Sequence, residues 1–137
     1  MNLVDSSAWL EYLADSERAS LFAEPIERTR QLIVPVLVIY ELFKKVLRER
    51  GEQPALDVYG LLLQGNVIEV DAELATAAAR LPLPLADSII YATAQRHRAI
   101  LWTQDEHFED LPGVKFFPKR GFETVGFPNL AAKHPAE

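Results

Sequence analysis

The chain has 137 residues, of which 49% are hydrophobic and 25% charged, a balance typical of one soluble globular domain with a single core. It contains no cysteine, which excludes a disulfide framework, a thiolate zinc site and a cysteine nucleophile, and which suits a reducing compartment, so we expect a cytoplasmic protein. The net charge of -6 argues mildly against a nucleic-acid partner, unless basic side chains gather locally.

Short apolar runs alternate with helical patterns along the chain. In chain order they predict a strand at 2–4, helices at 8–15 and 18–30, a strand at 31–35, helices at 36–50 and 54–65, a strand at 66–70, helices at 71–81 and 82–97, and strands at 99–103 and 114–117. This alternation predicts an α/β domain with a central, mostly parallel sheet covered by helices on both faces.

The ends of the chain and its most apolar run bear on domain organisation. The N-terminus has neither a basic start nor a long apolar run, and the run at 32–43 is interrupted by Pro35 and Glu41, so we expect no signal peptide and no membrane span. The periodic patterns end near residue 118. We therefore expect one domain over 1–118, followed by a surface-lying or partly disordered extension at 119–137.

Four acidic residues lie near the carboxyl ends of the predicted strands, where ligands gather in an open parallel sheet. Asp5 follows the first strand, and Asp105 follows the fourth. Glu41 lies within the helix after the second strand, and Asp87 lies at the start of the helix that leads to the fourth. All four side chains could therefore reach one end of the sheet.

Three of these acids also have plain structural explanations. Asp5 and Asp87 are placed where a helix cap or an acid near a helix N-terminus is common. Asp105 lies inside the capping-box pattern Thr103-x-x-Glu106, where an acid in the first turn is expected from the helix dipole. Helix capping and chemistry therefore both stay open for these three.

Glu41 could form an ion pair with Lys45 one turn further along its helix, worth roughly 0.2–0.5 kcal/mol. Carboxylates that converge on one end of a sheet repel one another, and a hard divalent cation such as Mg²⁺ or Mn²⁺ would relieve that repulsion. The histidines lack a metal-binding spacing, so we expect surface or supporting roles for His97, His107 and His134. Glycine-rich phosphate loops and the G-x-S-x-G serine motif are absent.

Four segments carry a resemblance to a known family: VDSSAWLEYL at 4–13, VLVIYEL at 36–42, LPLADSIIYATAQ at 83–95 and LWTQDEHFEDLPGVKFF at 101–117. Together they resemble a PIN-domain protein, and in particular the VapC-type toxin ribonucleases of type II toxin–antitoxin pairs. The resemblance covers about residues 1–118. Its most specific part is the ordered set Asp…Glu…Asp…[ST]-x-Asp-x-x-Phe.

The resemblance implies a three-layer α/β fold and assigns roles to the acids. The family's metal-binding and catalytic positions correspond to Asp5, Glu41, Asp87 and Asp105. Thr103 matches a hydroxyl position that supports the site, and Ser6 is expected to act likewise. The implied cofactor is Mg²⁺ or Mn²⁺, which would bind the scissile phosphate and activate a water molecule.

The implied activity is that of a toxin which hydrolyses RNA phosphodiester bonds. Family members usually form homodimers, and a VapB-type antitoxin silences them in heterotetramers or larger assemblies. Because an acidic pocket repels RNA, basic residues around it must hold the substrate. The candidates for RNA binding are Lys44, Lys45, Arg48, Arg96 and Arg98.

Three other functions remain as alternatives. A catalytically idle PIN-like module that binds RNA or protein would have lost at least one acid, whereas this chain keeps the full set. A PIN nuclease of RNA processing would share the chemistry without being a toxin. A phosphorylated receiver domain would have paired acids after its first strand and a lysine at the acidic end of the sheet; here serines follow Asp5, and Lys115 lies within the last predicted strand.

Overall fold

Five parallel strands form one sheet in the order β3-β2-β1-β4-β5 in the computed structural model, which describes residues 1–119. The strands are β1 (Asn2–Val4), β2 (Leu32–Pro35), β3 (Asn66–Ile68), β4 (Ile100–Thr103) and β5 (Val114–Phe116). In the central strand, Leu3 pairs with Ile33 of β2 and with Leu101 of β4. Because the strands are parallel, the residues that follow β1 and β4 emerge side by side at one edge of the sheet.

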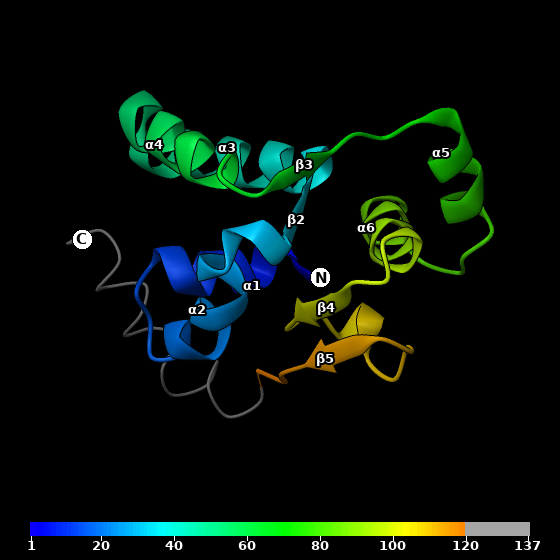
Figure 1. Cartoon of the computed structure of the whole chain (residues 1–137). Coiled ribbons are helices and arrows are strands. Elements are labelled where there is room, and N and C mark those ends of the chain that lie inside the picture. Colours follow the sequence, from blue (N-terminus) through cyan, green and yellow to red (C-terminus); the bar gives the residue numbers. More distant parts are fainter. Residues whose placement is uncertain (120–137) are drawn as a thin grey trace.

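Helices cover both faces of this sheet (Figure 1). They are α1 (Ser6–Leu13), α2 (Ala19–Glu27), α3 (Val36–Arg50), α4 (Glu52–Leu62), α5 (Ala72–Ala79) and α6 (Leu85–Arg96), with short 3-10 helices η1 (Thr29–Gln31) and η2 (Glu106–Phe108). Figure 1 shows α1 and α2 on one side of the strands and α5 and α6 on the other, with α3 and α4 paired beside α1. This is the predicted three-layer α/β architecture with a parallel sheet.

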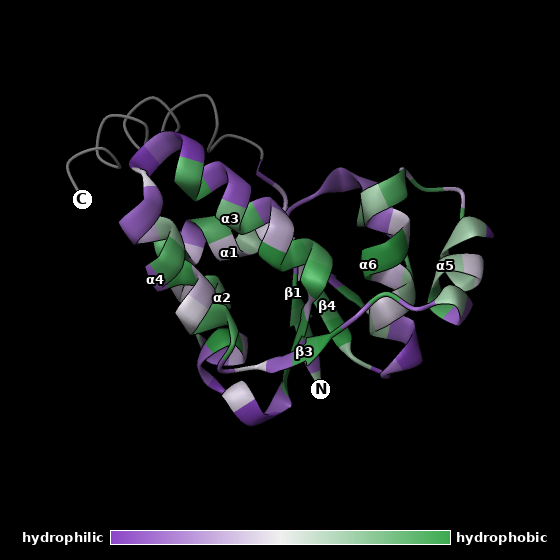
Figure 2. Cartoon of the chain, turned by 90° about the horizontal axis from the view of Figure 1, so that it is seen from above, coloured by the Kyte–Doolittle hydropathy of each residue, from purple (hydrophilic) through white to green (hydrophobic). Residues whose placement is uncertain are grey.

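The core lies between the sheet and its helices. Leu3 and Val4 of β1 are fully buried, and all four residues of β2 are buried, as expected for parallel strands covered on both faces. Figure 2 shows the hydrophobic residues on the strands and on the helix segments beside them. Trp9 of α1 and Phe108 of η2 are among the largest side chains buried in this core. The apolar runs of the sequence therefore build the sheet that carries the acidic residues at its edge.

Most predicted elements form within a few residues of their expected ends. The helix at 36–50 is confirmed, and Gly51 ends it with a φ of 96°, a conformation that favours glycine. The next helix begins at Glu52 rather than at Pro54, since a proline fits within the first turn of a helix. Gly65 is needed for space, because a Cβ there would lie 2.8 Å from Val34 Cγ2.

Two expectations concern the chain as a whole. Within residues 1–119, no helix is both long enough and apolar enough to cross a membrane. The predicted extension at 119–137 lies, from residue 120 onward, outside the described residues, so the predicted boundary between domain and extension stays a prediction.

Candidate metal centre

Asp5 fills the helix-capping role that its sequence position allowed, and its side chain is buried at the carboxyl end of β1. It is the N-cap of α1, where its Oδ1 accepts the backbone N–H of Ala8 at 3.2 Å and the hydroxyl of Ser7 at 2.8 Å. The side chain is almost wholly buried, and this burial raises the pKa of Asp5 from 3.8 to about 6, although its hydrogen bonds act in the opposite direction. Ionising a carboxylate that is this deeply buried costs free energy at neutral pH, and a bound cation would lower that cost.

Thr103 connects the ends of β1 and β4. Its fully buried hydroxyl donates to Asp5 Oδ2 at 2.6 Å and accepts the backbone N–H of Asp105 at 2.9 Å. The prediction that Thr103 begins a capping box is wrong, because Thr103 ends β4 and Asp105 itself caps η2, accepting the N–H of His107 at 2.9 Å. One hydroxyl therefore joins the carboxylate of Asp5 to the backbone of Asp105.

Asp87 faces the same edge of the sheet from the first turn of α6. Pro84 occupies the N-cap position of this helix, so Asp87 does not cap it and lies in its first turn instead. Its carboxylate is mostly buried, with 16% of the side chain exposed. Burial first, and then the negative charge of Asp105, raise the pKa of Asp87, while His107 lowers it.

His107 belongs to this group, although no metal-binding motif in the sequence singled it out. Its Nδ1 lies 2.7 Å from Asp87 Oδ2 and 3.2 Å from Asp105 Oδ1. The charge of Asp105, followed by the contacts with Asp87, raises the pKa of His107. One donor atom from each of Asp87, Asp105 and His107 lies within 4.8 Å of the others. Two carboxylates and an imidazole at this spacing are a donor set that suits a divalent cation.

Glu41 accepts a hydrogen bond from the hydroxyl of Ser6, the residue that follows Asp5 in the chain. The ion pair predicted between Glu41 and Lys45 is wrong, because Lys45 Nζ instead binds Glu49 Oε2 at 2.7 Å. Glu41 is partly buried and stands outside the group of three whose donor atoms lie within 4.8 Å. The structure therefore brings Asp5, Asp87 and Asp105 to one edge of the sheet and links Glu41 to that edge through Ser6.

Sequence patterns missed a polar network beneath the site. Gln104 is 3% exposed, and its amide donates to Glu11 Oε2 at 2.9 Å and to the carbonyl of Ser7 at 3.3 Å. Its backbone N–H also donates to Ser7 Oγ at 3.3 Å, and Arg18 Nε donates to its side-chain oxygen. These partners are separated by 86 to 97 residues in the chain, so no local pattern could have paired them.

The predicted RNA-binding residues fall into two groups. Lys44, Lys45 and Arg48 follow Glu41 on α3 at i+3, i+4 and i+7, a spacing that places all four on one face of the helix. Lys44 Nζ lies 3.2 Å from the hydroxyl of Tyr40 on the same helix.

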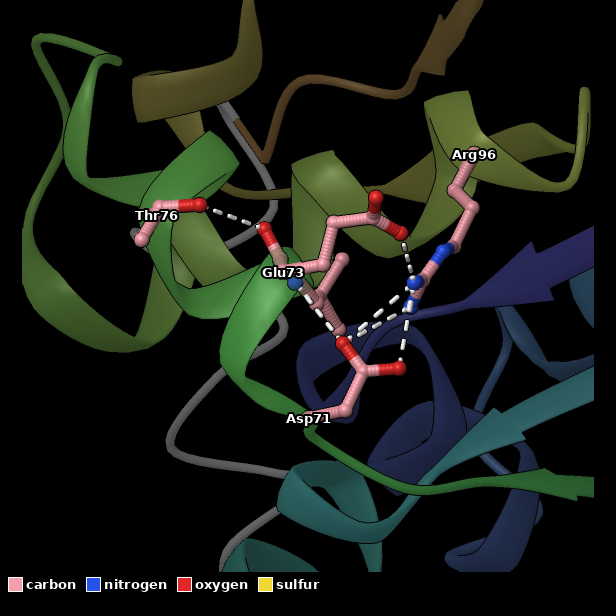
Figure 3. Close-up of polar contacts among 5 residues, drawn as sticks. Asp71, Glu73, Thr76 and Arg96 are labelled. Carbon is pink, nitrogen blue, oxygen red and sulfur yellow. Dashed lines mark hydrogen bonds and ion pairs between the residues drawn. The ribbon is translucent and has the colours of Figure 1, made fainter.

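Arg96 is the last residue of α6, roughly 13 Å along the helix axis from Asp87, and Arg98 follows just after the helix. Figure 3 shows Arg96 bound to Asp71 and Glu73, with contacts of 3.1 and 2.9 Å. These contacts join the start of α5 to the end of α6. Nothing in this position supports an RNA-binding role for Arg96.

The receiver-domain alternative finds no support at this edge. Lys115 Nζ lies 4.4 Å from the centre of the Trp102 ring, so the lysine packs on an aromatic face instead of joining the carboxylates.

Comparisons with known proteins agree with this architecture. The family model described as the PIN domain matches residues 3–114. A toxin–antitoxin complex from Klebsiella pneumoniae contains a chain that is 25% identical, with a TM-score of 0.71, covering 86% of this chain and 99% of that one. VapC20 of Mycobacterium tuberculosis, a sarcin-ricin loop cleaving toxin, is 20% identical, with a TM-score of 0.68, covering 86% of this chain and 100% of that one.

A DNA-bound VapBC complex from Salmonella typhimurium contains a chain that is 16% identical, with a TM-score of 0.65, covering 86% of this chain and 98% of that one. The last two likenesses, being below 25% identity, bear on the fold alone. The search of curated proteins found no match.

Proposed function

This chain belongs to the PIN domain family, and from that premise we propose that it is the toxin of a toxin–antitoxin pair and acts as a divalent-metal-dependent endoribonuclease. The observation that carries the proposal is the meeting of Asp5, Asp87 and Asp105 at one edge of the sheet, with Glu41 linked to them through Ser6. The likeness to the toxin–antitoxin complex from Klebsiella pneumoniae, over nearly the whole of that chain, supports the toxin role.

The metal-binding residues in this proposal are Asp5, Glu41, Asp87 and Asp105, and the cofactor is Mg²⁺ or Mn²⁺. When bound, the ion would supply a Lewis acid for the scissile phosphate and a water molecule of lowered pKa. Three hydrogen bonds hold the Asp5 carboxylate in place, so it needs no reorganisation to meet a cation. Ser6 holds Glu41 by a donated hydrogen bond and so fixes the direction of the fourth carboxylate.

The RNA would lie along α3 beside these acids. Lys44, Lys45 and Arg48 share a helix face with Glu41, and their positive charge would offset the repulsion between the acids and phosphate. The partners that we propose are an RNA substrate, a second copy of the chain and a VapB-type antitoxin, the last two in a heterotetramer or larger assembly. Hydrolysis by a metal-activated water would leave a 5′-phosphate and a 3′-hydroxyl.

Cleavage of a structured RNA by the purified chain tests the activity. We expect cleavage with Mg²⁺ or Mn²⁺, none with EDTA, and none from a folded Asp87→Asn variant. A folded wild-type chain that binds RNA but leaves it intact under both metals would contradict the nuclease and support an idle binding module.

Growth measurements test the toxin role separately. Induced expression of the chain should arrest growth of the host cells, and co-expression of the antitoxin encoded beside it should restore growth. RNA cleavage in vitro without any growth arrest would favour a PIN nuclease of RNA processing over a toxin.

A further inference from the structure

The imidazole of His107 turns toward the carboxylates even though the residue is exposed. More than half of its side-chain surface, 57%, remains open to solvent, yet Nδ1 lies within 3.2 Å of both Asp87 and Asp105. It is the one nitrogen donor in the group of three potential ligands found among residues 1–119. Its place in the molecule therefore calls for an explanation beyond that of a surface histidine.

The backbone and the core hold His107 at this position. Its N–H donates to Asp105 Oδ1, which closes the first turn of η2. The next residue, Phe108, is fully buried and stacks on Tyr91, with ring centres 6.4 Å apart. Tyr91 lies one helical turn after Asp87 on α6, so the same packing that anchors η2 also places His107 opposite Asp87. The orientation is built into the fold and does not depend on the exposed ring alone.

Two roles for His107 are compatible with this geometry, and they have opposite consequences. As a counter-ion, His107 would neutralise the carboxylates and would have to be displaced by a metal ion, so its removal would strengthen metal binding. As a ligand, it would add a donor to the metal, so its removal would weaken binding. The three donor atoms already lie within 4.8 Å of one another, close enough for all three to hold one ion.

We propose that His107 is a nitrogen ligand of the metal centre and that it gives this centre a preference for Mn²⁺ over Mg²⁺. The proposal rests on the metal-dependent function proposed above. Mg²⁺ selects oxygen ligands and retains its water molecules, whereas an imidazole nitrogen adds affinity for transition metals. An all-carboxylate site would discriminate less between the two ions than a site with one nitrogen.

Calorimetric titration of the purified chain with Mn²⁺ and with Mg²⁺ tests this preference. We expect His107→Ala to weaken Mn²⁺ binding about tenfold or more, while changing Mg²⁺ binding by less than about threefold. His107→Gln should behave in the same way, which guards against a local packing effect of the alanine. The matched control is His97→Gln, at the end of α6 away from the site, which should leave both affinities unchanged.

Pulsed electron paramagnetic resonance of the Mn²⁺-loaded chain provides a readout that does not depend on activity. We expect nitrogen coupling to the manganese in the wild type and in His97→Gln, and its loss in His107→Ala. Unchanged or tighter Mn²⁺ binding in His107→Ala, or a wild-type spectrum without nitrogen coupling, would overturn the proposal.

The Asp87→Asn variant separates failure of this inference from failure of the proposed function. If Asp87→Asn loses metal binding while both His107 variants keep it, the metal-dependent function stands and only the role of His107 fails. If Asp87→Asn binds both metals as the wild type does, the metal centre itself is wrong, and the role of His107 falls with it.

Discussion

The hydroxyl of Thr103 donates a hydrogen bond to Asp5 Oδ2 at 2.6 Å, joining the last residue of β4 to the first residue after β1. The same oxygen accepts the N–H of Asp105 at 2.9 Å. A single buried hydroxyl thus ties the Asp5 carboxylate to the backbone of Asp105. It also helps to keep the buried Asp5 ionised, because its hydrogen bond lowers the pKa that burial raises.

Replacing Thr103 by valine tests this link. Thr103→Val should reduce the free energy of unfolding by about 1–3 kcal/mol, because two buried polar groups lose a partner. It should also reduce metal-dependent RNA cleavage, since Asp5 and Asp105 lose their common tether. Thr103→Ser keeps the hydroxyl and is the control. Urea unfolding and RNA cleavage provide the two measurements, and equal behaviour of the two variants would contradict the bridging role.

The raised pKa of Asp5 predicts how the metal-free protein responds to pH. Its pKa is about 6 in the folded chain against an ordinary value of 3.8, so folding favours the protonated form. The resulting stability is fully present below pH 3.8 and is lost as the pH rises through 6. By pH 8 the loss amounts to about 3 kcal/mol.

Asp5→Asn should therefore be more stable than the wild type at pH 8 when metal is chelated, with a shallower decline of the melting temperature between pH 4 and pH 7. Part of the decline should persist, because the pKa of Asp87 is also raised. Asp57→Asn, on the exposed face of α4, is the matched control. If stability falls with pH in parallel for the wild type and Asp5→Asn, then ionisation of Asp5 does not reduce the free energy of unfolding. Adding Mn²⁺ should stabilise the wild type and not Asp5→Asn.

Glu41 and Glu49 form a matched pair on α3. Glu41→Gln should abolish most of the RNA cleavage, because it removes one of the proposed metal-binding carboxylates. It should have little effect on stability, because the Glu41 side chain is only partly buried and is held by one side-chain hydrogen bond, from Ser6. Glu49→Gln breaks the surface pair with Lys45, should cost less than about 1 kcal/mol and should leave cleavage intact. Equal cleavage rates in the two variants would remove Glu41 from the site.

The basic residues that share one face of α3 with Glu41 predict where RNA binds. Lys44→Gln and Arg48→Gln should each weaken RNA binding and reduce the salt dependence of log K by about 0.7, the value for one phosphate contact on a single strand. Arg98→Gln is the control, because Arg98 lies just beyond the end of α6 that is opposite to Asp87. Filter binding in 50–300 mM KCl measures both quantities, and a larger effect of Arg98→Gln would place the RNA on the other side of the molecule.

The order of strands and helices could be predicted from the sequence because each element carries its own local signal. The helix at 36–50 has an apolar face and a glycine stop, and the helix predicted from residue 71 forms as α5, with Asp71 as its N-cap. Helix ends were less predictable where a proline intervened, as at Pro54, since a proline is compatible with both the start and the first turn of a helix.

The sequence by itself determined the α/β alternation and the order of the four acids near the carboxyl ends of the strands, since apolar periodicity and chain order are local properties. Tertiary structure decided which partners these acids take. It gave Glu41 a hydrogen bond from Ser6 instead of an ion pair with Lys45, and it turned His107 toward Asp87, 20 residues earlier in the chain. It also buried Asp5 beside Thr103, which shifts its pKa. Such contacts depend on how parallel strands bring distant segments together at one edge, and no spacing within the chain encodes that distance directly.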